Sequence, residues 1–95
     1  MAYDAPIHDM AFTLQAVAGL PKLEGLPGFE AYDADLIAPI LEEAGKLARD
    51  VLAPLNQPGD AAGAQLTEDG VKAAPGFAEA YAQFREGGWM GLAAP

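Results

Sequence analysis

The chain has 95 residues, of which 52% are hydrophobic, 5 are basic and 14 are acidic, and its formal net charge is −9. This length allows one domain at most, and the composition is that of a globular chain rather than a disordered one. The negative charge repels polyanions, so nucleic acid is a poor partner. The absence of cysteine excludes disulfides, thiolate catalysis and cysteine-ligated zinc.

The sequence pattern indicates neither a signal peptide nor a membrane span. Its apolar runs are shorter than the ~18 residues that a membrane-spanning helix needs. Asp4 and Asp9 precede the first basic residue, Lys22, whereas a signal peptide begins with positive charge. We therefore expect a cytoplasmic protein.

Residues 1–32 are predicted to form an N-terminal extension. Residues 1–7 have an extended pattern, and residues 8–18 predict a short helix followed by Gly19, a residue typical of helix ends. The side chains expected on one side of this helix are Met10, Leu14 and Val17. A loop rich in glycine and proline follows. The apolar residues expected to pin this loop to a core are Leu23, Leu26, Phe29 and Tyr32.

The strongest periodic pattern opens the second predicted segment, residues 33–95. The stretch DADLIAPILEEAGKLARDVLAPLN predicts a long amphipathic helix, capped at its start by Asp33 or Asp35. We place its end near Ala53, because Pro54 is a poor continuation of a helix. The residues expected on its apolar face are Leu36, Ile37, Ile40, Leu41, Ala44, Leu47, Ala48, Val51, Leu52 and Leu55.

Two features lie within this helix pattern. Glu42 and Lys46 have the spacing of a favourable ion pair. Pro39 costs little if it lies near the first turn and would kink the helix if it lies further in.

The remaining residues predict a small β-hairpin and one further helix. The hairpin turns about Glu68-Asp69-Gly70, and the helix ends at Gly87. The apolar stripe of this helix, interpreted as core, is Phe77, Ala80, Tyr81 and Phe84. The predicted fold class is all-α: a small helical domain of about three helices, one of them long and amphipathic, with a minor β-hairpin.

The acidic residues and the histidine show no catalytic or metal-binding pattern. The glutamates with polar or borderline helix positions, interpreted as solvated side chains, are Glu42, Glu43, Glu79 and Glu86. His8 has no partner at a motif spacing, and Asp33 and Asp35 are better explained as helix caps than as metal ligands. The eleven glycines contain no G-x-G-x-x-G and no phosphate-binding loop. We assign no catalytic, cofactor-binding or metal-binding residue.

Three segments, VLAPLNQPGD, VKAAPGF and GGWMGLAAP, occur here in an order and spacing that are fairly specific together. With the leading AP…DM.F.L segment they resemble the amino-terminal portion of an acyl-CoA dehydrogenase. Within that family the chain is similar to the longer bacterial subgroup that includes 3-methylmercaptopropionyl-CoA dehydrogenases. The resemblance covers essentially the whole chain.

The resemblance implies an N-terminal helical domain, a middle β domain and a C-terminal helical bundle. It also implies FAD as cofactor and removal of the α and β hydrogens of an acyl-CoA thioester by a glutamate base and the flavin. No position of this chain matches that base or the flavin contacts. We therefore expect FAD and acyl-CoA to bind the parent enzyme, a homo-oligomer, through domains outside these residues.

The apolar ending GGWMGLAAP is interpreted as a connection to the rest of the helical domain, truncated at residue 95. The alternative is a tail that packs back over Phe77, Tyr81 and Phe84. Trp89 is expected to be packed in either case. The functional prediction is a structural part of a dehydrogenase, inactive alone, and the alternative is an autonomous helical protein-interaction module. A carrier protein with a phosphopantetheine arm is excluded because the sequence has no serine.

Overall fold

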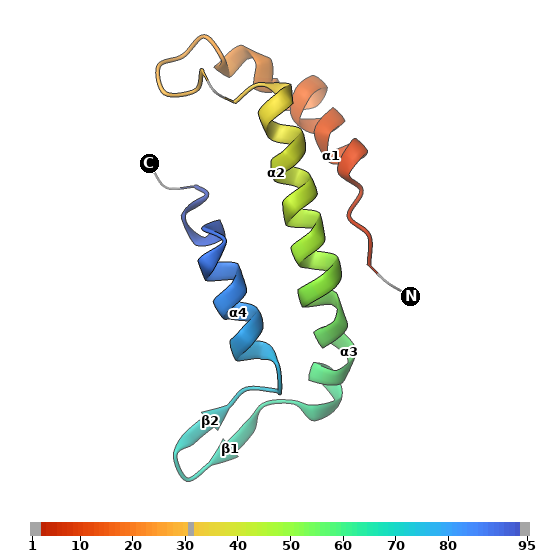
Figure 1. The fold of residues 1–95 in the computed structure, drawn as a ribbon, viewed down its shortest axis with the longest axis vertical. Coiled ribbons are helices and arrows are strands. Elements are labelled where there is room, and N and C mark those ends of the chain that lie inside the picture. Colours follow the sequence, from red (N-terminus) through yellow and green to blue (C-terminus); the bar gives the residue numbers. More distant parts are fainter. Residues whose placement is uncertain (1–2, 31, 94–95) are drawn as a thin grey trace. The chain divides into compact units, whose positions relative to one another are not determined.

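The computed structural model describes residues 3–30 and 32–93. These residues are mostly helical, with one small antiparallel sheet, as expected from the sequence (Figure 1). The chain divides into two compact units, Tyr3–Arg49 and Asp50–Pro95. The predicted division into residues 1–32 and 33–95 stays a prediction.

The first unit begins with the short helix predicted for residues 8–18. α1 (Ile7–Phe12) continues directly into a π turn, η1 (Thr13–Val17). Gly19 follows with a φ of +75°, which confirms it as the end of the helix. Leu14 is partly buried, but Met10 and Val17, predicted on the same side, are 41% and 73% exposed. The π turn moves Val17 away from that side, because its i→i+5 bonds rotate each residue less than an α-helix does.

α1 packs against α2 (Ala34–Leu47) with the opposite chain direction (Figure 1). Gly45 of α2 is buried at this contact. A Cβ atom at Gly45 would lie 3.1 Å from Ile7 Cδ1 and 3.6 Å from Ala5 Cβ. The absence of a side chain at Gly45 thus lets the chain before α1 lie against α2.

Asp33 caps α2, which settles the choice between Asp33 and Asp35. Its side chain accepts a hydrogen bond from the Leu36 backbone N–H at 3.0 Å. Pro39 lies inside the helix. The predicted pair of Glu42 with Lys46 is wrong, because the Lys46 ammonium instead lies 3.1 Å from the Glu43 carboxylate.

The loop between these helices is closed by its own backbone. η2 (Leu20–Leu23) is followed by a series of turns, each closed by a backbone hydrogen bond between residues three positions apart. The Leu26 N–H donates to Leu23 O at 2.9 Å, and the Phe29 N–H donates to Leu26 O at 3.1 Å. The Phe29 and Tyr32 rings contact each other with centroids 6.0 Å apart. The four apolar side chains expected to pin the loop are 37–48% exposed. Local turns therefore order this loop without burying it.

The predicted end of the long helix near Ala53 is wrong. Helical backbone continues through a second π turn, η3 (Ala48–Leu52), into α3 (Ala53–Ala62). Pro54 lies at the start of α3, directly after the π turn, and does not end the helix there. The helix ends instead at Gly63, which has a φ of +67°.

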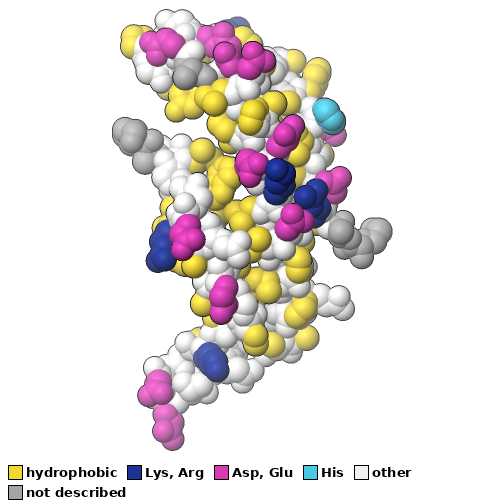
Figure 2. Space-filling view, viewed as in Figure 1, with side chains coloured by type: hydrophobic (Ala, Val, Ile, Leu, Met, Phe, Trp, Pro, Cys, Tyr) yellow, Lys and Arg dark blue, Asp and Glu magenta, His cyan; other side chains and the backbone are white. Residues whose placement is uncertain are grey.

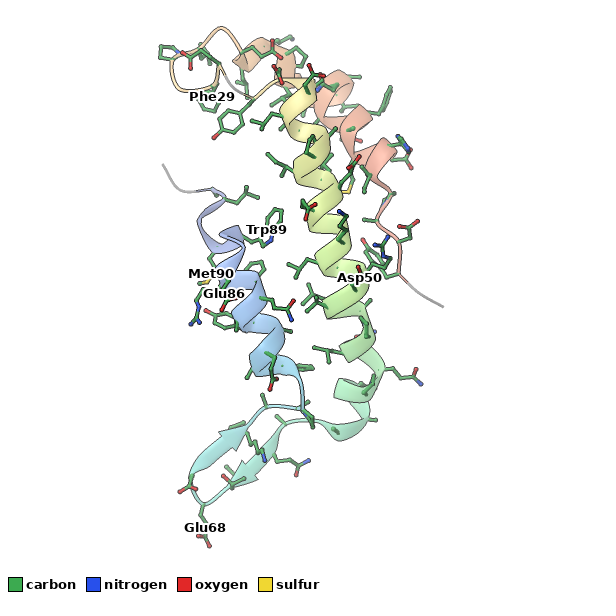
Figure 3. The ribbon with its side chains drawn as sticks, viewed as in Figure 1. Phe29, Asp50, Glu68, Glu86, Trp89 and Met90 are labelled. Atoms are coloured by element: carbon green, nitrogen blue, oxygen red, sulfur yellow. The ribbon has the colours of Figure 1, made fainter. Side chains whose placement is uncertain are left out.

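In the second unit, β1 (Gln65–Thr67) and β2 (Gly70–Lys72) form the predicted hairpin. Leu66 pairs with Val71, and these two side chains are 86% and 75% exposed. The Thr67 hydroxyl donates to Gly70 O at 2.8 Å and closes the turn. Glu68 projects from the hairpin tip (Figure 3).

α4 (Phe77–Glu86) follows and ends at Gly87, as predicted. It is succeeded by a short 3₁₀ turn, η4 (Trp89–Gly91). Ala74 and Ala80 are the buried hydrophobic residues of the described chain, and both are small. The larger apolar side chains of both units remain at least partly exposed, so the described residues have no closed core.

Candidate functional site

The carboxylates considered as candidate acids or bases lie in water. Glu42, Glu79 and Glu86 are exposed, as expected, and Glu43 holds the exposed ion pair with Lys46. His8 is exposed near the start of α1, also as expected. Within residues 3–30 and 32–93 no group of three or more His, Asp or Glu side chains is placed to hold a metal ion.

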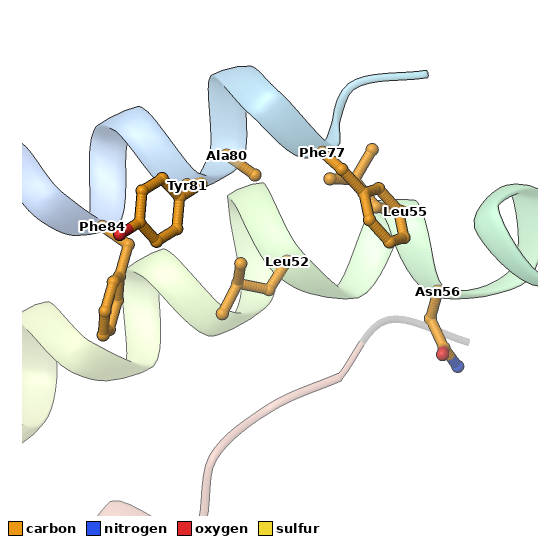
Figure 4. A pocket seen from close by; sticks show the side chains of 7 residues that line it. All are labelled: Leu52, Leu55, Asn56, Phe77, Ala80, Tyr81 and Phe84. Atoms are coloured by element: carbon orange, nitrogen blue, oxygen red, sulfur yellow. The ribbon is translucent and has the colours of Figure 1, made fainter. Parts of the chain in front are cut away.

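An apolar groove lies in the second unit (Figure 4). One wall comes from η3 and α3 and the other from α4, and the volume is about 340 Å³. Phe77 lies by Leu55 at one end, and Tyr81 and Phe84 lie toward the other (Figure 4). The lining residues are Leu52, Leu55, Asn56, Phe77, Ala80, Tyr81 and Phe84.

This groove corrects the interpretation of the α4 stripe as core in part, because Ala80 is buried and Phe84 is partly buried but the other two side chains are not. Phe77 is 42% exposed and Tyr81 is 53% exposed, and Leu52 opposite them is 44% exposed. The α4 stripe and the apolar face around Leu52 and Leu55 do meet, but they enclose open space instead of filling it.

Two glycines hold the walls of the groove together. A Cβ atom at Gly59 would lie 2.6 Å from Phe77 Cζ, so the ring rests directly on the α3 backbone. A Cβ atom at Gly76 would lie 2.8 Å from Leu55 Cδ2, and Gly76 has a φ of +89°. Phe77 of α4 therefore packs against Gly59 of α3, and Leu55 of α3 packs against Gly76, the residue before α4.

The chain beyond α4 partly folds back on it. The Tyr81 hydroxyl donates to Met90 Sδ at 3.4 Å. Trp89 is partly buried, and its Nε1 would lie 2.8 Å from a Cβ atom at Gly87. Trp89 and Met90 project to different sides of η4 (Figure 3). The expectation that Trp89 packs is therefore met in part by this local turn.

A second, shallower pocket lies in the first unit on α1 and η1. Its lining residues are Asp9, Met10, Thr13 and Leu14. The Thr13 hydroxyl donates to Asp9 O at 2.8 Å and is thereby used within the helix. This pocket presents no nucleophile with a base beside it.

Neither pocket suits a flavin dinucleotide or coenzyme A. Their phosphates require Lys or Arg side chains, or a glycine-rich loop at a helix N-terminus. The linings of both pockets contain neither Lys nor Arg, and the first-unit pocket includes the acidic Asp9. Acidic side chains exceed basic ones across the visible face (Figure 2). The residues of these two linings do not fit the cofactor that the sequence resemblance implies.

Comparison with known proteins relates this chain to the acyl-CoA dehydrogenases. No family model matches the chain. It is, however, 34% identical over all 95 residues to the 3-methylmercaptopropionyl-CoA dehydrogenase of Ruegeria pomeroyi. The chain covers 16% of the length of that relative. This similarity confirms the resemblance found in the sequence, both to the family and to its subgroup.

In the part of the chain that the structure describes, no helix combines the length and the apolar character needed to cross a membrane.

The groove was not predicted from the sequence. The long helix was predicted to end near Ala53, six residues before Gly59, so Gly59 fell outside it. The spacing of Leu52, Leu55 and Gly59 continues the apolar face by one turn and could have indicated it.

Proposed function

We propose that this chain is part of an acyl-CoA dehydrogenase and supports its fold without supplying a reacting group. The observation that carries the proposal is the 34% identity to such an enzyme over all 95 residues. Since the chain covers 16% of that relative, the reaction itself belongs to the longer protein.

The supporting role follows from what the described residues offer. They present apolar helix faces with side chains such as Leu52, Phe77 and Tyr81 that remain exposed. The linings of the α3–α4 groove and of the pocket on α1 and η1 contain neither Lys nor Arg, the cationic groups that a nucleotide cofactor needs. We assign these helices to an N-terminal helical domain, and FAD and the acyl-CoA thioester to other parts of the longer protein.

A test of the parent activity begins with the gene. We expect the reading frame to extend beyond codon 95, and the purified product to contain FAD. Given an acyl-CoA and an artificial electron acceptor, it should form the α,β-unsaturated thioester, and 3-methylmercaptopropionyl-CoA is the first substrate to try. The mass of the same product in solution tests the proposed homo-oligomer. A frame that ends at codon 95, or a product without dehydrogenase activity, contradicts the proposal.

A second test uses the isolated 95-residue chain. Adding FAD should leave flavin absorbance and fluorescence unchanged, because no described pocket carries a cation for the diphosphate. Tight binding with quenched flavin fluorescence would show that the flavin contacts lie in this chain.

A second candidate function, an autonomous interaction module, is favoured by the exposed Leu66–Val71 pair and the open groove. It predicts a stop codon directly after Pro95 and a small protein that is purified with a partner. The length of the reading frame separates the two candidates.

A further inference from the structure

The groove between α3 and α4 has the properties of a binding surface for another helix. Its lining is apolar apart from Asn56, and three of its side chains, those of Leu52, Phe77 and Tyr81, are 42–53% exposed. Apolar surface gathered in this way on a soluble protein marks an interaction site. Parallel walls made of helices favour an amphipathic helix as the occupant.

The two ends of the groove carry opposite charges. Asp60 lies one helical turn beyond Asn56, and Arg85 lies one turn beyond Tyr81, so each flanks the lining of its own helix. Because Phe77 contacts Gly59, the start of α4 lies at the end of α3, and the two helices run in opposite directions. Asp60 and Arg85 therefore flank opposite ends of the groove. In the described residues both are exposed and neither has an ion-pair partner.

We propose that an amphipathic helix from elsewhere in the longer dehydrogenase polypeptide covers this groove. Its apolar residues would follow a three- and four-residue spacing, with a basic residue facing Asp60 and an acidic residue facing Arg85. The wall from Leu52 of η3 to Gly59 of α3, on which the Phe77 ring rests, is about 10 Å long, or two helical turns. That the helix belongs to the same polypeptide rests on the proposed function. The expected spacing and charges of the helix are inferred from the groove itself.

Other occupants fit less well. A second copy of this chain brings a formal charge of −9 toward another of −9, which opposes association. An acyl-CoA or a nucleotide carries phosphates, and the lining has no Lys or Arg to receive them.

The experiment measures whether the groove is covered in the longer protein. The 95-residue chain has no cysteine, so a single cysteine can be introduced as a reporter. Leu52→Cys and Tyr81→Cys place a thiol in the groove, and Gln83→Cys places one on the exposed opposite face of α4 as a matched control. Each variant is prepared in the 95-residue chain and in the longer enzyme, and the rate of labelling by a thiol reagent is measured above the background of the longer enzyme.

We expect the groove cysteines to react at least about tenfold more slowly in the longer enzyme than in the isolated chain, since labelling then requires local opening of about 1.4 kcal/mol. Gln83→Cys should react at similar rates in both. Fast labelling of the groove in an enzyme that is active overturns this inference and leaves the proposed function intact. Protection that disappears when the enzyme is diluted to a monomer assigns the groove to a second copy and also overturns it. A reading frame that ends at codon 95 overturns both.

The charge pattern has its own test in the longer enzyme carrying Leu52→Cys. Asp60→Lys and Arg85→Glu should each raise the labelling rate of the groove cysteine, because each places like charges against the covering helix. Glu79→Lys, on the other face of α4, is the control and should leave the rate unchanged. An unchanged rate in both charge reversals contradicts the proposed charges of the helix.

Discussion

The two units bring helices together at a glycine in each case, but the two contacts leave different amounts of room. At Gly45 in the first unit, an added methyl group would meet the mobile end of Ile7 at 3.1 Å. At Gly59 in the second unit, it would meet the Phe77 ring at 2.6 Å and 2.7 Å. The first contact can adjust by a few tenths of an ångström, whereas the second requires the ring to leave its place. Glycine is therefore more strictly required at Gly59 than at Gly45, although both lie where helices meet.

The second unit adds another constraint that the first lacks. Gly76, directly before α4, has a φ of +89° and lies close to Leu55 of α3. The junction thus depends on backbone conformation as well as on space. Substitutions at these glycines should separate the two effects.

Gly76→Ala should have the largest effect. The left-handed backbone costs about 1–2 kcal/mol with a side chain present, and crowding against Leu55 adds about 1–3 kcal/mol. We expect a loss of about 2–5 kcal/mol in the free energy of unfolding, measured by urea denaturation with circular dichroism. Gly88→Ala is the matched control, because Gly88 has the same left-handed conformation, with a φ of +80°, and no atom within 4 Å of an added Cβ. Equal losses in both variants would show that the contact with Leu55 contributes nothing.

Gly59→Ala should be the next largest. Displacing the Phe77 ring costs about 1–3 kcal/mol, and the higher helix propensity of alanine recovers about 1 kcal/mol. We expect a net loss of up to about 2 kcal/mol and faster amide exchange in α3 and α4. In a double-mutant cycle with Phe77→Ala the loss should largely disappear. A loss that persists without the ring would place its cause elsewhere.

Asp33→Ala tests the first unit at its helix cap. Removing the acceptor of the Leu36 N–H should cost about 1 kcal/mol, with faster exchange confined to the first turn of α2. Asp35→Ala is the control, since Asp35 follows the cap and makes no such bond in the described structure. A similar loss for both would mean that the general negative charge at the helix start matters and the cap does not.

Gly45→Ala should have the smallest effect. The gain in helix propensity, about 0.8–1 kcal/mol, is offset by a small displacement of Ile7. We expect a net change within about 0.5 kcal/mol in urea denaturation. A loss as large as that of Gly59→Ala would remove the difference between the two contacts on which this comparison rests.

The sequence predicted the elements whose signals are local. Gly19, Gly87 and the Glu68-Asp69-Gly70 turn were placed correctly, and the helix cap was narrowed to Asp33 or Asp35, because capping groups and tight turns act within a few residues. The end of α3 was not predicted, since a π turn at Ala48–Leu52 let the helix continue past Pro54. The groove depends on contacts between residues about twenty positions apart, such as Gly59 with Phe77. Periodicity in one helix indicates that a face is apolar, but it does not show whether the facing helix fills the space.

The hairpin described above also governs how the isolated chain should behave in concentrated solution. Leu66 and Val71 lie side by side on a two-stranded sheet whose outer edges are open to further strands, an arrangement that favours sheet-to-sheet aggregation. Glu68 and Asp69 at its tip act as gatekeepers, because stacking hairpins would bring their carboxylates together. Colloidal stability of the chain should therefore fall as added salt screens that repulsion.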